Sequence, residues 1–176
     1  MSHSPTGRFE RPRLAPDVEH GIVYRNDAEF CAWPFLGGLW RPADGSLLLG
    51  FTRKGVSYDN PDEIHHDNLG QSKGILVTIR SNDGGRTWSA DTFEDLFDLS
   101  TPPDAIPTAD PGTTDLRLDF CDPDVLVASG AVPVRFAPGA RAWVKISTDG
   151  GRHWRAPVAM PMTGLTSLSG QGSATV

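Results

Sequence analysis

Side chains that could take part in chemistry are concentrated between residues 53 and 73. This stretch contains a guanidinium group, several carboxylates and two adjacent imidazoles, among them Arg53, Asp59, His65, His66 and Asp67. A carboxyl group serves as a general acid when a partly desolvated site raises its pKa, whereas a nearby guanidinium favours the carboxylate. The stretch is too long for a simple hairpin connection, and long loops held by surrounding structure often carry function. We therefore expect a site here, with solvated loop residues or turn braces as the alternative interpretation of both aspartates.

The run His65-His66-Asp67 is the one place where the types of the residues raise the question of a metal ion. Neighbours in an extended segment point to opposite sides, so at most one of the two imidazoles shares a face with Asp67. No other cluster in the sequence completes a ligand set. We therefore expect no metal and no cofactor.

The elements that must position these side chains are marked by a repeat. Ser81-Asn82-Asp83-Gly84-Gly85-Arg86-Thr87-Trp88 recurs as Ser147-Thr148-Asp149-Gly150-Gly151-Arg152-His153-Trp154. Each copy follows an apolar run typical of a strand, so each is expected to form the turn of a hairpin. The paired glycines tolerate positive φ, the aspartate accepts hydrogen bonds from turn amides, and the tryptophan packs under the turn. The repeat predicts architecture and not catalysis.

Around the two copies, the sequence predicts short strands separated by turns rich in Gly and Pro. The strongest signal is Asp44-Gly45, a hairpin turn between strands at 38–41 and 46–52. Further strands are expected at 21–24, 74–79, after Trp88, and at 125–128, 132–136, 142–146 and 156–160, with a turn at Ser129-Gly130 and a short helical turn at 92–99. In the apolar run 30–35, Pro34 argues against a long central strand. The pattern predicts an all-β fold built of four-stranded antiparallel units.

Composition narrows the classes of partner. The chain has 176 residues and a formal net charge of −6, which argues against a general nucleic-acid or anionic-membrane surface. No window approaches a membrane span and no export signal is visible, so the chain is expected to be soluble. Its two cysteines, Cys31 and Cys121, are too few for a disulfide framework and are expected to be buried as small apolar side chains.

The two copies match the Asp-box (BNR) pattern Ser-x-Asp-x-Gly-x-Thr-Trp, with His153 in place of Thr in the second. Together with the spacing and the strand order, they make the chain resemble the N-terminal portion of a sialidase-like six-bladed β-propeller. The resemblance implies about two and a half four-stranded antiparallel blades. The expected divisions are an irregular arm at 1–20, blade 1 at about 21–98, blade 2 at about 117–162, and the start of blade 3 at about 170–176.

The resemblance implies an exo-glycoside hydrolase that acts on a terminal sugar of a glycan. Arg53 and Asp59 stand where the family has an arginine followed by an acid/base aspartate, so they are carried over as substrate-positioning and catalytic residues, with Asp67 as an alternative catalytic carboxylate. Asp122, which precedes Pro123, is similar to the family's Asp-Pro near the central cavity and is a candidate substrate-binding residue.

One departure from the family bears on the sugar. The family's first blade opens with an arginine that binds the substrate carboxylate and lies before a proline, but here the matching stretch is Ala32-Trp33-Pro34. The proline is present and the arginine is absent, which leaves sialic-acid specificity open. Trp33 is a candidate for stacking on a sugar, whereas Trp40, inside an expected strand, is expected to pack in the core.

The family's Tyr–Glu nucleophile pair and its remaining arginines come from later blades. Two alternatives therefore stay open: a non-catalytic Asp-box propeller that binds glycan or protein, and an incomplete chain without activity alone. Expected partners are carbohydrate and, through open sheet edges, further copies of the chain. Nucleic acid and a membrane span are not expected.

Overall fold

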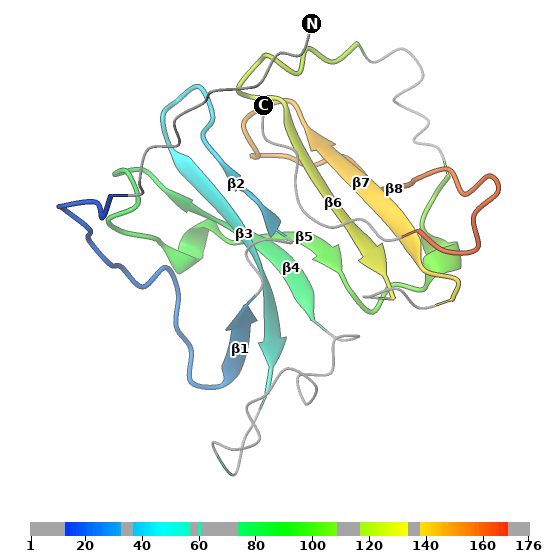
Figure 1. The fold of residues 1–176 in the computed structure, drawn as a ribbon, viewed down its shortest axis with the longest axis horizontal. Helices are drawn as coiled ribbons and strands as arrows, with labels where there is room; N and C mark the ends of the chain where they lie inside the picture. Colours follow the sequence, from blue (N-terminus) through cyan, green and yellow to red (C-terminus); the bar gives the residue numbers. More distant parts are fainter. Residues whose placement is uncertain are drawn as a thin grey trace, which may run out of the picture.

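The computed structural model describes residues 13–32, 37–56, 60, 74–108, 117–133 and 138–168. The strands in these residues form two antiparallel sheets, which lie against each other (Figure 1). The expected all-β fold is confirmed, whereas the described residues form sheets of five and three strands in place of the expected four-stranded units. Trp33, Asp59 and Asp67 lie outside the described residues, as do residues 1–12 of the expected arm and the expected strand at 170–176.

The first sheet has five strands in which two short strands share one edge. The strands are β1 (Glu29–Ala32), β2 (Leu39–Trp40), β3 (Leu47–Gly55), β4 (Ile75–Ser81) and β5 (Glu94–Asp98). Both β1 and β2 pair with β3, β1 along residues 52–55 and β2 along residues 48–49, and β4 and β5 come next on the other side. The predicted Asp44-Gly45 hairpin is confirmed, with the Gly45 N–H donating to the Pro42 carbonyl at 3.0 Å.

The second sheet has three strands, β6 (Leu126–Val132), β7 (Arg141–Ser147) and β8 (Val158–Ala159). Short 3₁₀ turns, η2 (Ala90–Thr92) and η3 (Pro103–Ala105), flank β5. In Figure 1, β6 and β7 run alongside the first sheet, with β6 next to β2. Each Asp-box sequence comes at the end of a strand, the first after β4 and the second after β7, as the repeat predicts.

The main core lies between the two sheets. Trp143 of β7 is fully buried there and stacks on Phe97 of β5 with ring centroids 4.2 Å apart. Trp40 of β2 is 5% exposed and contacts Trp154, which confirms its expected place in the core. Because side chains of both sheets fill one cluster, the two sheets are packed face to face.

A second, smaller cluster covers the outer face of the first sheet. Phe51, Val77 and Ile79 are buried there under partly buried side chains from two irregular segments, among them Val23, Tyr24, Trp88 and Phe93. The strand expected at 21–24 is wrong, because this segment pairs with no strand of the described residues and instead lays its side chains over the sheet. Both faces of β4 are consequently covered, which explains its run of four buried residues.

Three further expectations are corrected. Residues 94–98 are a strand and not a helical turn, because Leu96 and Phe97 complete the core beside β4. The chain does not turn at Ser129-Gly130 but runs straight through as β6. The missing side chain of Gly130 gives room to an indole, since a Cβ atom there would lie 2.6 Å from Cζ2 of Trp143. Cys121 is exposed and Cys31 half-buried, and both are free thiols.

Candidate functional site

The two Asp-box turns share a set of serine and aspartate hydrogen bonds. In each, the serine hydroxyl donates to the aspartate Oδ1 at 2.8 Å and accepts the N–H of the second glycine at 2.9 Å. The aspartate then accepts the backbone N–H four residues later at 2.9 Å. Asp83 and Asp149 are therefore turn braces, as predicted. Their acceptor bonds occupy them within the turn.

The one departure from the Asp-box pattern, His153 in place of threonine, has a structural equivalent. Thr87 donates its hydroxyl to Oδ2 of Asp83 at 2.6 Å, and His153 places Nδ1 2.6 Å from Oδ2 of Asp149. Hydrogen bonds from Thr87 lower the pKa of Asp83 to about 2. For Asp149, burial alone would raise the pKa, but bonds from His153 and Ser147 outweigh it and bring the pKa to about 2. The histidine thus replaces the threonine as a donor.

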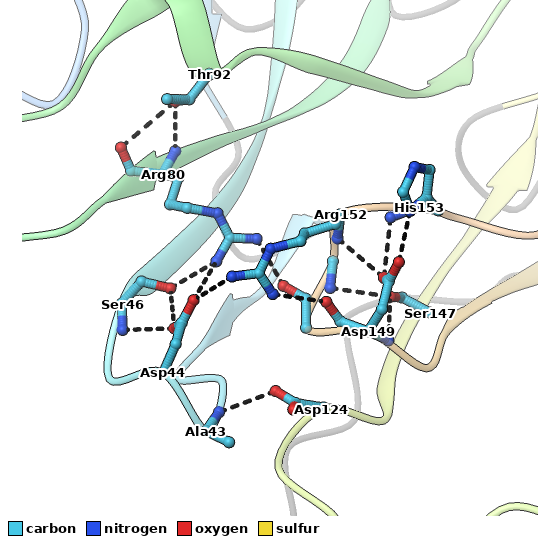
Figure 2. Close-up of polar contacts among 12 residues, drawn as sticks. Ala43, Asp44, Ser46, Arg80, Thr92, Asp124, Ser147, Asp149, Arg152 and His153 are labelled. Atoms are coloured by element: carbon cyan, nitrogen blue, oxygen red, sulfur yellow. Dashed lines mark hydrogen bonds and ion pairs between the residues drawn. The ribbon is translucent and has the colours of Figure 1, made fainter.

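The second Asp-box turn also ties the two sheets together (Figure 2). Arg152 donates from Nη2 to Oδ2 of Asp44 at 2.7 Å, and Arg80, at the end of β4, donates to the Gly150 carbonyl at 2.6 Å. The Ala43 N–H donates to Oδ1 of Asp124 at 2.9 Å. We call these four side chains, together with the second Asp-box turn and the Asp44-Gly45 turn, the inter-sheet contact. Its polar groups serve the packing of the sheets.

The candidate Arg53 lies at the other end of the first sheet. In the register of β3 with β4, Leu47 pairs with Ser81 of the first Asp-box while Arg53 pairs with Ile75. Six residues of strand separate Arg53 from Leu47, or roughly 20 Å. Arg53 belongs to β3 itself, so the polar connection expected to start at Arg53 begins only after Gly55. The first Asp-box turn and Arg53 therefore lie at opposite ends of the first sheet.

Arg53 is held by an acidic and an aromatic partner. Its Nη2 donates to Oε1 of Glu29 at 2.7 Å and its Nε to Oε2 at 3.2 Å, a two-point ion pair with side chains 25% and 20% exposed. Tyr24 donates its hydroxyl to Oε2 of Glu29 at 2.9 Å and lies 3.4 Å from Nη2 of Arg53. The guanidinium carbon is 4.2 Å from the ring centre of Phe93 and 5.1 Å from that of Tyr24.

These contacts fix the charges of the pair. The hydrogen bond from Arg53 lowers the pKa of Glu29, and burial opposes this more weakly. The bond to Glu29 raises the pKa of Arg53. Both groups are therefore charged at neutral pH, and two aromatic rings limit the movement of the guanidinium. The resulting Tyr24–Glu29–Arg53 cluster is a rigid polar group at one end of β3.

A cavity of about 570 Å³ opens beside this cluster. Its lining is mixed, with two acidic, two basic and several apolar or glycine residues: Glu29, Arg53, Lys54, Gly55, Gly74, Ile75, Val77 and Asp95. The volume falls in the range of small-molecule sites, and few convergent polar groups on an apolar wall are what such a site needs. The size and the lining of the cavity resemble those of a site for a polar organic ligand.

The structure does not bring the other described candidate to this cavity. Asp122 belongs to the second half of the chain and lines a separate groove of about 330 Å³ with Leu39, Trp40 and Phe120. Its Oδ1 accepts the Asp124 N–H at 2.9 Å, so it braces a turn before β6. Among the described residues, no group of three His, Cys, Asp or Glu side chains could hold a metal ion.

Sequence reasoning missed Glu29 and Tyr24. The two residues lie 24 and 29 positions before Arg53, in a stretch without a motif. The one sequence signal for Glu29 is the apolar run that begins at Phe30, which indicates a short strand. When this strand pairs with β3, Glu29 lies opposite Gly55. Only the register of that pairing shows that Glu29 meets Arg53.

Comparisons of the chain with protein-family models, with curated proteins and with solved structures find no match. In the part of the chain that the structure describes, no helix has the length and apolar character needed to cross a membrane.

Proposed function

We propose that the two sheets are successive blades of a sialidase-like β-propeller and that the complete assembly is an exo-glycoside hydrolase acting on a terminal sugar. The observation that carries the proposal is the second Asp-box turn, which repeats the bonds of the first and joins its own sheet to the sheet before it. Repeated antiparallel sheets packed face to face, each joined to its predecessor, are what radial repetition requires.

In this proposal, the sugar binds at the Arg53 end of the first sheet. The cavity there lies away from the Asp-box turns and carries charged side chains of both signs. Arg53 orients the substrate, and Asp59, which comes later in the connection between β3 and β4, is the acid/base that donates a proton to the leaving-group oxygen. Asp67 is the alternative carboxylate.

The test is hydrolysis of a panel of aryl glycosides by the full chain, with Asp59→Asn as the decisive variant. Loss of a general acid is expected to lower the turnover about 10²–10⁴-fold. Asp17→Asn, a change at an exposed aspartate of the N-terminal segment, is the matched control and should leave turnover unchanged. Equal turnover by the wild type and Asp59→Asn would refute the assignment, and a loss in Asp67→Asn alone would move it to Asp67.

A second candidate function is a non-catalytic propeller that binds glycan. The observation that favours it is the ion pair between Arg53 and Glu29. The hydrolase proposal assigns the Arg53 guanidinium to the substrate, but in the structure this group is bound to Glu29. In this interpretation, the same glycosides bind at the cavity but release no aryl group, so the hydrolysis assay separates the two functions.

A further inference from the structure

The guanidinium of Arg53 is already engaged by neighbouring side chains of the protein. Arg53 already donates to both carboxylate oxygens of Glu29, and Nη2 also contacts the Tyr24 hydroxyl. Two-point recognition of a ligand carboxylate needs two neighbouring N–H groups on one edge of the guanidinium. The Nε/Nη2 edge is occupied, and the other edge shares the Nη2 atom that Glu29 and Tyr24 contact.

The charged side chains that line the cavity neutralise one another. Glu29 Oε1 lies 2.7 Å from Nη2, so an anion that approached the guanidinium would also meet the carboxylate that neutralises it. The rest of the lining adds one basic and one acidic side chain, Lys54 and Asp95. The four charged residues sum to zero, and the cavity has no excess positive charge to attract an acid.

The cavity offers a ligand hydrogen-bond acceptors and an apolar surface. An ionised carboxylate has about four acceptor sites, and hydrogen bonds from Arg53, Tyr24 and Asn26 engage those of Glu29. Asp95 is exposed on β5 and adds further acceptors. Ile75, 37% exposed, adds an apolar surface to the lining. Hydroxyl donors and a C–H face match these two surfaces.

We infer that the Arg53 cavity binds an uncharged, hydroxyl-bearing ligand, a neutral sugar, and discriminates against sugars that carry a carboxylate. The inference rests on the proposed sugar-binding function and specifies its substrate class. Discrimination comes from Glu29, because a ligand carboxylate would have to displace it from Arg53 and leave it half-buried without its partner. Arg53 is then a positioning residue that holds Glu29 toward the ligand.

The experiment compares methyl glucoside with methyl glucuronide, which carries a carboxylate at C6 in place of the hydroxymethyl group. Each is titrated into the full chain, and binding is monitored by NMR. The Arg53 Nε–H signal reports whether the ligand lies at the cavity. We expect the neutral glycoside to bind about tenfold more tightly than its acid, the factor that 1.4 kcal/mol gives. Methyl galactoside and methyl galacturonide provide an independent pair.

Glu29→Gln is the informative variant, because it keeps the shape of the side chain and removes the charge that neutralises Arg53. The preference should then shift toward the glucuronide by about tenfold. Tyr24→Phe, which removes the hydroxyl contacts with Glu29 and with Nη2 of Arg53, should shift it in the same direction by less and covers the case in which Glu29→Gln does not fold. Glu19→Gln, in the exposed N-terminal segment, should not shift it.

The outcomes separate the inference from the function on which it rests. Equal or tighter binding of the acids by the wild type, or an unchanged preference in Glu29→Gln and Tyr24→Phe, would overturn the inference while leaving sugar binding intact. Absence of binding by both neutral and acidic glycosides would overturn the proposed function and the inference with it.

Discussion

At the scale of single residues, three aspartates are held ionised by donors from nearby turns, and this gives the protein a defined acid response. The pKa of Asp44 is lowered from 3.8 to about 2, first by the Ser46 hydroxyl and then by the Ser46 N–H and Arg152. Asp83 and Asp149 reach the same value. A carboxylate with a depressed pKa contributes stability above its unfolded pKa and loses it as the pH falls.

We therefore expect the thermal midpoint to fall most steeply between pH 3.8 and 2. In Asp149→Asn, the fall in this window should be shallower. In the wild type, residue 149 binds a proton in the unfolded state at a pH where the folded state leaves it ionised, and the asparagine removes this difference. The measurement is a series of melting curves followed by circular dichroism. Parallel curves for the wild type and the variant would show that Asp149 is not stabilised as an anion in the fold.

At the scale of elements, β6 depends on a glycine that serves packing and not turning. A Cβ atom on Gly130 would lie 2.6 Å from Cζ2 of the Trp143 side chain, which is stacked on Phe97 and cannot move freely. Gly130→Ala is expected to lower the free energy of unfolding by about 1–3 kcal/mol, the usual cost of overpacking. Gly55→Ala, at the exposed end of β3 where nothing lies within 4 Å of such a Cβ, is the control for urea titrations. Similar losses in both would contradict the packing role.

The same glycine shows how far the sequence predicts these elements. Asp44-Gly45 and the Asp-box turns were predicted correctly because their conformation is decided locally, by positive φ and by aspartate side chains that bond to their own turn. Gly130 has an ordinary strand conformation, and its partner lies 13 residues along the chain on another strand. A local rule that assigns Gly to a turn therefore fails there, and the strand expected at 125–128 continues through the glycine to Val132.

The candidate site was harder to predict than the fold for a related reason. Arg53 could be selected from its position after an apolar strand, but its charge is set by Glu29, which only the register of β1 with β3 brings to it. Asx turns account for Asp122, which the resemblance had offered as a binding residue. Residue types indicate which groups are capable of chemistry, whereas sheet register decides which of them meet.

At the scale of the whole molecule, the two Asp-box turns are alike in conformation but unlike in surroundings. The second is pressed between sheets, so that a Cβ atom on Gly151 would lie 2.4 Å from Cδ2 of Leu48 and 3.1 Å from Cδ1 of Leu126. The corresponding atom on Gly85 of the first turn would meet only Leu47 at 3.3 Å and Trp88 at 3.8 Å.

The outer face of the second sheet has a groove of about 230 Å³, whose lining includes Val144, Ile146, Val158 and Met160. The expected self-association of the chain stays a prediction.

The contrast between the two Asp-box turns allows the contribution of the inter-sheet contact to be measured directly. Both glycines have positive φ, 79° at Gly151 and 91° at Gly85, so an alanine at either position carries the same kind of backbone strain. Only Gly151→Ala also forces the two sheets apart. We expect it to cost about 1–3 kcal/mol more than Gly85→Ala in urea titrations monitored by tryptophan fluorescence. Hydrogen exchange should accelerate along both β3 and β6 in Gly151→Ala, while in Gly85→Ala it should accelerate around the first turn alone. Equal losses of stability would mean that the sheets do not depend on the second Asp-box turn for their packing.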